Sequence, residues 1–232
     1  GIGKSVFASL TTGDYNVGIG YNALAANTTA GGNVAIGNDA GAATTTAGDI
    51  VAIGSGALLT NVTGGGLVAV GGGALKLNTG SSNTAVGNTC LRYLTSGDNN
   101  TAVGYRSQMN TTTADDNTSI GFQSLDANTT GASNTSVGNN SLGANTTGAD
   151  NVAVGNQALY TQTTGGSNTA VGKQAMYAST TGGNNAAFGI SALKDNTTGH
   201  ENAGLGRYAL QNNTTGQENT GVGNAAIETN TT

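Results

Sequence analysis

The sequence contains no proline and no tryptophan, and only 8% of its 232 residues are charged. Glycine accounts for 40 residues, so the composition departs far from the average of globular domains. Disordered chains usually combine a high net charge with few aliphatic residues. The low charge therefore argues against ordinary disorder, and the chain calls for another kind of ordered structure.

Several classes of function lack their usual signals. Seven Lys and Arg residues and a formal net charge of −5 leave no basic footprint for nucleic acid. No run of about 18 apolar residues is present, so we expect no membrane insertion. The single cysteine, Cys90, excludes an internal disulfide framework.

What the sequence does contain is a short repeat that runs along its whole length. The glycine of an "AVG"-like triplet recurs fourteen times from Gly3 to Gly223, with a spacing of seventeen in twelve of the intervals and of sixteen between Gly71 and Gly87. The short interval has lost one residue at 78–83, where other copies read "NTTG" followed by two residues and Asn. Because the register resumes after this deletion, "NTTG" is predicted to be a loop.

The ends of the sequence match the same pattern. The chain opens on "GIG" and stops on "TNTT", and both are parts of a repeat. No secretion signal is visible, but such a segment is expected to lie elsewhere if the sequence is a window of a longer array. We therefore expect residues 1–232 to be one repetitive segment without end caps.

The repeat is numbered here from 1 to 17 with the recurrent glycine at position 5. Position 4 is apolar in every copy, position 9 is apolar in all but two, and position 8 is Ala, Ser or Cys in all but one. Positions 1–5 carry β-branched residues and end at glycine, whereas positions 12–15 read mostly Asn-Thr-Thr-Gly, which is typical of turns. Extended segments are predicted at positions 1–5 and 7–11, and one repeat is too short for two packed helices.

This pattern predicts an all-β fold, a parallel β-solenoid (β-roll or β-helix) of about 14 coils. Each residue then lies about 4.8 Å from its counterpart in the next coil, so identical side chains stack. Positions 4 and 9 are expected to form continuous apolar ridges, and the asparagines of positions 1 and 12 to bond along the stack. Glycine at position 5 is expected at a bend or at a contact without room for a Cβ.

The same pattern indicates association between chains. Each coil has only two sizeable aliphatic side chains, which is a small core for a repeat of this length. If positions 7–11 are extended, positions 8 and 9 face opposite sides of a strand, and both are apolar. We therefore expect a core inside the coil and a partner outside it, in an intertwined or side-by-side homotrimer or another homo-oligomer.

Three stretches carry a resemblance to known families: "NVAIGNDA" at 33–40, "IVAIGSGAL" at 50–58 and "NTSVGNNSL" at 134–142. They resemble the "SVAIG" motif in the heads of YadA-like trimeric autotransporter adhesins, and they are similar to repeat arrays in phage tail-fibre proteins. Every copy of the repeat carries the likeness, which implies parallel β-roll or β-helix subunits in an obligate trimer on a cell or virion surface. The repeat is longer than that of the adhesin heads by the NTTG element, so the coil shape and the trimer contact do not carry over in detail.

No group of residues indicates an enzyme. His200, the only histidine, stands at position 16 beside Glu201, and no Ser or Cys nucleophile has a linked base. Cys90 occupies the small-residue position 8 and is expected to be buried packing. We predict that the chain is not an enzyme and holds no cofactor.

Acidic residues gather at positions 16 and 17, where eight of the 12 are found. Asp98, Asp115 and Asp116 are weak candidates for a calcium site, since stacking brings Asp98 over Asp115 and carboxylate oxygens suit this ion. The alternative is a hydrated loop edge that discourages lateral aggregation, and the sequence favours this alternative.

Aromatic and basic residues depart from the repeat at positions 6, 7 and 10, while the apolar positions stay fixed. Such variation is expected on an outer face, and tyrosines with scattered cations suit a glycan or a protein receptor. The possible receptor-facing residues are Tyr21, Tyr105, Phe122, Tyr160, Tyr177, Arg207 and Tyr208, and the cations Lys76, Arg92 and Lys194 also stand at position 10.

The leading hypothesis is a shaft or head segment of an extracellular trimeric fibre, in a phage tail fibre or a bacterial surface adhesin. A rigid repetitive rod would mediate attachment, with many weak sites acting by avidity. The expected partners are other copies of the chain and a cell-surface glycan or protein receptor.

Two alternatives belong to other classes. An ice-binding β-solenoid would use threonine ladders, but the threonines of positions 13 and 14 are adjacent in a turn and cannot form a flat pair. A glycan-cleaving phage spike would need paired carboxylates in a cleft, and no such pair is consistent along the repeats.

Overall fold

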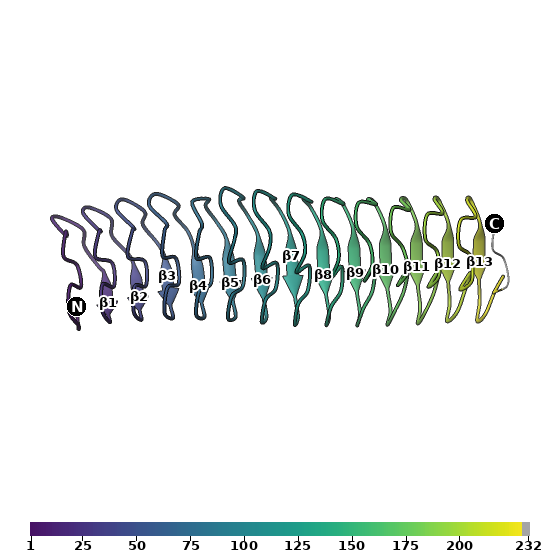
Figure 1. Cartoon of the computed structure of the whole chain (residues 1–232), viewed down its shortest axis with the longest axis horizontal. Helices are drawn as coiled ribbons and strands as arrows, with labels where there is room; N and C mark the ends of the chain where they lie inside the picture. Colours follow the sequence, from purple (N-terminus) through teal and green to yellow (C-terminus); the bar gives the residue numbers. More distant parts are fainter. Residues whose placement is uncertain (229–232) are drawn as a thin grey trace. The chain divides into compact units, whose positions relative to one another are not determined.

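The computed structural model describes residues 1–228, which fold into successive coils, and from residue 17 on each coil carries one three-residue strand (Figure 1). The strands divide between two compact units, Gly1–Asp116 and Asn117–Thr232. The predicted all-β parallel β-solenoid with a 17-residue repeat is confirmed. Over the described range, no helix has the length and apolar character needed to span a membrane.

In the first unit six strands pair in parallel and in chain order. The first pair joins Val17 to Val34 and Ile19 to Ile36, and an isolated bridge between Ile2 and Ile19 precedes it. The strands are β1 (Val17–Ile19), β2 (Val34–Ile36), β3 (Val51–Ile53), β4 (Val68–Val70), β5 (Thr84–Val86) and β6 (Thr101–Val103).

In the second unit seven strands pair in the same way. Each residue again meets its counterpart in the next repeat, as where Thr169 pairs with Ala186. The strands are β7 (Thr118–Ile120), β8 (Thr135–Val137), β9 (Val152–Val154), β10 (Thr169–Val171), β11 (Ala186–Phe188), β12 (Ala203–Leu205) and β13 (Thr220–Val222).

The shortened repeat keeps the register of the sheet. Val68 pairs with Thr84 and Val70 with Val86, although the interval is one residue short. The segment 78–82 that lost the residue lies outside any strand. The prediction that the Asn-Thr-Thr-Gly element is a loop is therefore confirmed.

Small residues fill the inside of the coil behind each strand. In every strand the middle residue, position 3, is buried, while positions 2 and 4 on either side are not, because side chains alternate across a strand. Leucines at position 9, such as Leu58 and Leu159, fill the rest of the interior and are fully buried. The expectation for position 9 is confirmed.

Position 4 stacks into an apolar ridge along each unit, as expected, but the expectation that its side chains belong to the core is wrong. Ile120 is 43% exposed and Phe188 42% exposed, so these aliphatic and aromatic side chains point out of the coil. The reason is the alternation of the strand: once the Ala or Ser of position 3 faces inward, position 4 must face outward.

The predicted extended segment at positions 7–11 is also wrong, because the chain turns there. Positions 7 and 9 take the left-handed conformation, with φ of 57° at Gln157 and 50° at Leu159. This conformation costs an ordinary residue about 1 kcal/mol, and full burial of the leucine offsets it. As a result Ala158 and Leu159 are both fully buried, rather than on opposite faces as in a strand.

The recurrent glycine of position 5 is required both by its backbone and by its neighbour. Gly155 has φ of 135°, which only glycine adopts without strain. A Cβ on Gly155 would lie 2.6 Å from the carbonyl oxygen of Gly172 in the next coil. Both reasons expected for this glycine, a bend and a close contact, are therefore present.

Buried asparagines connect the coils, as predicted for positions 1 and 12. At position 1, the side-chain amide of Asn151 donates to Oδ1 of Asn134 at 3.1 Å and to the carbonyl oxygen of Gly165 at 3.0 Å. At position 12, the amide of Asn145 donates to Oδ1 of Asn128 at 3.1 Å. These side chains are fully buried, so each coil is held by polar as well as apolar contacts.

Candidate interaction surfaces

The first unusual surface is the outward side of the strands, here called the outer strand face and defined as positions 2 and 4 of every repeat. Position 4 brings a row of Ile, Val, Phe or Leu to this face, and position 2 adds Val, Thr or Ala. In the first unit Ile19 is 37% exposed, and in the second unit Leu205 is 41% exposed. Because adjacent strands pair in register, like side chains lie next to one another along each unit.

An exposed apolar surface that continues over many strands is typical of an interaction site. The sequence showed the apolar character of position 4 but placed it inside the coil. The signal that would have placed it correctly is the strict Ala, Ser or Gly of position 3, since only small residues fit where a strand lies against the core.

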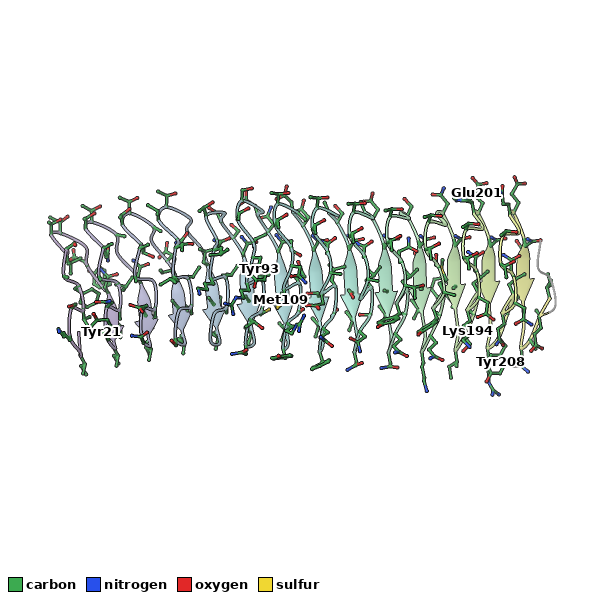
Figure 2. All side chains as sticks on the ribbon, viewed as in Figure 1. Tyr21, Tyr93, Met109, Lys194, Glu201 and Tyr208 are labelled. Atoms are coloured by element: carbon green, nitrogen blue, oxygen red, sulfur yellow. The ribbon has the colours of Figure 1, made fainter. Side chains whose placement is uncertain are left out.

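A second surface is the edge formed by the turn that follows each strand, at positions 6, 7 and 10. Figure 2 shows Lys194 and Tyr208 at this edge of the second unit and Glu201 at the opposite edge. The exposed aromatics at position 6 are Tyr21, Tyr105 and Phe122. Tyr21 and Tyr105 hold the same position five coils apart, so they do not form one cluster.

The structure brings Tyr160 together with Tyr177, and Arg207 together with Tyr208, among the predicted receptor-facing residues. The rings of Tyr160 and Tyr177 stack with centroids 5.5 Å apart and an angle of 18° between their planes. The guanidinium carbon of Arg207 lies 4.3 Å from the centroid of the Tyr208 ring, and its Nη2 donates to the tyrosine hydroxyl at 2.9 Å. These pairs order the side chains on the edge, and a receptor role for them stays a prediction.

The acidic edge uses its carboxylates to accept hydrogen bonds. The backbone N–H of Asp98 donates to Oδ1 of Asp115 at 2.8 Å, and the amide of Asn99 donates to Oδ1 of Asp116 at 3.2 Å. All three aspartates are exposed. In the part of the chain that the structure describes, no three His, Cys, Asp or Glu residues are placed to hold a metal ion together.

His200 lies on the same exposed edge. Its Nδ1 accepts a hydrogen bond from the backbone N–H of Gly183 at 3.0 Å, which connects two coils. This contact gives the imidazole a structural partner. That the chain is not an enzyme stays a prediction.

Cys90 is enclosed in the core of the first unit. Its Sγ donates to the carbonyl oxygen of Ala102 at 3.2 Å, as Ser124 Oγ does to Ser136 in the second unit at 2.9 Å. Burial raises the pKa of the Cys90 thiol from 9.0 to about 12, and backbone hydrogen bonding at Val86 has a smaller, opposite effect. The expectation of a buried packing residue is confirmed.

This raised pKa predicts a loss of stability in alkali. Between pH 9 and pH 12 the folded chain keeps the thiol proton while the unfolded chain loses it, so the free energy of unfolding falls as the pH rises. Compared with Cys90→Ser, the wild type should lose an extra stability of about 1–2 kcal/mol between pH 7 and pH 10. Urea unfolding at the two pH values measures this difference, and equal losses in the two proteins would contradict it.

The threonines of position 13 are used to join coils. Thr146 Oγ1 donates to the carbonyl oxygen of Thr163 at 3.0 Å, and Thr163 Oγ1 donates to that of Thr180 at 3.0 Å. The threonines of position 14, such as Thr147, are exposed. Only one threonine of each adjacent pair therefore presents its hydroxyl to water.

Comparison of the chain with models of known protein families gives no match, and neither does comparison with curated proteins or with solved structures. The function is therefore argued from the surfaces themselves.

Proposed function

We propose that this chain is a structural segment of an extracellular homotrimeric fibre, a phage tail fibre or a bacterial surface adhesin, that mediates attachment. The outer strand face is the observation that carries the proposal. From the sequence, positions 8 and 9 are expected on opposite faces of a strand, which indicates association. That indication does not hold, because positions 8 and 9 lie in a turn and both face the core, and the outer strand face takes its place. The resemblance to the repeats of trimeric adhesins and tail fibres supports an assembly of three chains and a location on a cell or virion surface.

Covering the outer strand face would stabilise an assembly appreciably. Full burial of a large aliphatic side chain contributes about 1.5–3 kcal/mol. Ile120, Phe188 and Leu205 each leave about two-fifths of their surface exposed. Covering position 4 therefore contributes about 1 kcal/mol at each of these residues and less at the half-buried Val137, Val154 and Val171, or several kcal/mol over the second unit.

A second copy of the chain fits this surface better than an unrelated partner. The face repeats at the strand spacing of about 4.8 Å, and another copy has the same spacing and the same sequence of ridges. Copies that run in parallel can therefore match ridge to ridge within each unit. Three copies around an axis parallel to the stack would cover the face and leave the edge of positions 6, 7 and 10 accessible to a receptor.

The test is the mass of the assembly and its response to charge on the outer strand face. We expect the wild type at micromolar concentration to have three times the 22.5 kDa chain mass in sedimentation equilibrium or mass photometry. The double variant Phe188→Glu, Leu205→Glu should dissociate to monomers, because a carboxylate buried in the contact without a partner costs several kcal/mol.

Phe122→Glu is the matched control. Phe122 is 47% exposed, close to the 42% of Phe188, but it stands at position 6 on the edge and not on the outer strand face. This variant should keep the trimer. A folded monomer of the wild type, or a double variant that stays trimeric, would refute the proposed assembly.

Ice binding is the alternative function. A freezing gap in a solution of the purified chain would support it. The internal hydrogen bonds of the position 13 hydroxyls speak against a flat lattice of threonines, because these groups already bond to the next coil.

A further inference from the structure

The first unit contains a groove on the edge formed by the turns after β2, β3, β4 and β5. Its volume is about 400 Å³, within the range of small-ligand sites. The hollow arises where positions 6 and 7 lack large side chains in two successive coils, at Ser55–Gly56 and at Gly72–Gly73. A Cβ on Gly56 would meet nothing within 4 Å, so the space above it is open.

Two side-chain hydrogen-bond donors lie above the glycines that form the base of this groove. Nδ2 of Asn88 lies 2.9 Å from the place of a Cβ on Gly72, and Nη1 of Arg92 lies 3.7 Å from that of Gly73. Both donors therefore occupy space that side chains fill in other coils. The lining of the groove is polar apart from Leu59, which suits a hydroxylated ligand better than an apolar one.

Two cations lie next to each other in the groove. Lys76 and Arg92 hold position 10 in consecutive coils, and the hydrogen bond from the N–H of Leu77 to the carbonyl oxygen of Arg92 fixes this stacking at 3.3 Å. Both side chains are half-buried, and the residues described by the structure offer neither of them an ion pair. Like charges that lie side by side repel each other. The guanidinium carbon of Arg92 lies 5.6 Å from the centroid of the Tyr93 ring. A bound anion would offset the remaining repulsion between the two cations.

The acceptor in the groove is already oriented. Oδ1 of Asp39 accepts a hydrogen bond from Nδ2 of Asn22 at 2.9 Å, which holds this half-buried carboxylate in place. A carboxylate at one part of the groove and two cations at another recognise a ligand that carries both hydroxyl groups and a negative charge. The guanidinium of Arg92 can receive a carboxylate through two parallel hydrogen bonds, and Lys76 adds a point charge.

We propose that this groove binds a carboxylated saccharide unit of a cell-surface glycan. Arg92 and Lys76 bind the carboxylate, while Asp39 and Asn88 bind sugar hydroxyls. The inference rests on the proposed attachment function for its biological setting. Because a fibre contains several copies of the chain, weak sites of this kind would together bind a surface more tightly than one site alone.

Trigalacturonate is the probe, and its fully methyl-esterified form is the matched neutral control. We expect calorimetric titration of the whole chain to detect binding of the acid, weakened by added salt because the attraction is electrostatic. The ester should bind at least about tenfold more weakly, because it loses the charge-assisted hydrogen bonds.

Two variants test the site in independent ways. Lys76→Gln with Arg92→Gln should weaken binding at least about tenfold. The melting temperature should change little, because the relief of repulsion between the cations opposes the loss of the contact between Arg92 and the Tyr93 ring. Gly56→Gln keeps both cations but fills the groove. Gly56 has φ of 65°, and Gln157 shows that glutamine adopts a similar φ, 57°, at position 7. It should weaken binding to a similar degree. The control is Lys194→Gln, since this cation holds position 10 next to Tyr177 and outside the groove, and it should leave binding unchanged.

Other results would overturn the inference. They are the absence of trigalacturonate binding, equal binding of the ester, and binding that none of the groove variants weakens. Competition by inorganic sulfate as strong as that by the acid would show a simple anion site and overturn the saccharide assignment. The mass of the assembly, measured on the same samples, separates the two proposals: a trimer that does not bind refutes only the groove, and a monomer that binds refutes only the fibre.

Discussion

Gly155→Ala is expected to lower the free energy of unfolding by about 4 kcal/mol or more. The backbone of Gly155 has φ of 135°, where any side chain is strained, and the new Cβ would lie 2.6 Å from the carbonyl oxygen of Gly172. The two coils would have to separate locally, and the hydrogen bond between Gly172 N–H and the oxygen of Val154, 2.8 Å long, would be strained with them.

Urea unfolding followed by circular dichroism measures the total effect, and hydrogen exchange locates it. In a repeat protein each unit contacts only its neighbours, so the lost protection should concentrate in the coils of Gly155 and Gly172. The matched control is Gly204→Ala in the same unit. Position 3 is alanine in most copies, including the neighbouring Ala187. A Cβ on Gly204 would lie 3.3 Å from Cγ of Leu193, a side chain that can shift slightly, so this variant should change stability by less than about 1 kcal/mol. If the two alanine variants were equally stable, the contact between position 155 and the carbonyl oxygen of Gly172 would not be what requires glycine there.

Asn134→Asp should destabilise the second unit by about 3–5 kcal/mol at neutral pH. The side-chain amide of Asn134 donates to the carbonyl oxygen of Gly148 at 2.9 Å and to Oδ1 of Asn117 at 3.2 Å. A carboxylate of the same shape would face these two acceptors with a negative charge, in a fully buried place. Its pKa should be raised, so the folded chain binds a proton more readily than the unfolded chain. The deficit relative to wild type should therefore shrink as the pH falls.

Two further variants separate charge from shape. Asn139→Asp makes the same change at an exposed position whose Oδ1 only accepts, from Asn140 and Asn156, and it should be nearly neutral. Asn134→Leu removes the polar group, and Ile50 and Leu67 hold the same buried position elsewhere. We expect it to cost less than Asn134→Asp, and thermal melts at pH 7 and pH 4 would show the order. A stable Asn134→Asp variant with no response to pH would contradict a strict amide ladder.

The candidate surfaces were only partly predictable. The sequence identified Lys76 and Arg92 as exceptions to the repeat at position 10, and the structure adds that they share a groove. The signal for the groove is in the sequence, as small residues at positions 6 and 7 in two successive copies. The sequence does not show that positions 6, 7 and 10 lie at one edge. They do so because the chain turns there through residues in the left-handed conformation.

The outer strand face was missed for a related reason. Apolar residues at positions 4 and 9 look equivalent in the sequence, and both were expected in the core. The strand at positions 2–4 and the turn at positions 6–11 point them in different directions, so Leu159 is enclosed while Phe188 faces out.

The sequence by itself determined the repeat, the parallel stacking of one coil on the next, the loop that absorbed a deletion, and the asparagine and glycine columns. These features follow from periodicity, because a residue that stacks on its own copy must suit that copy in every coil. Only the tertiary structure decided which apolar column is inside, since burial depends on backbone conformation within the coil and the period is the same for every column.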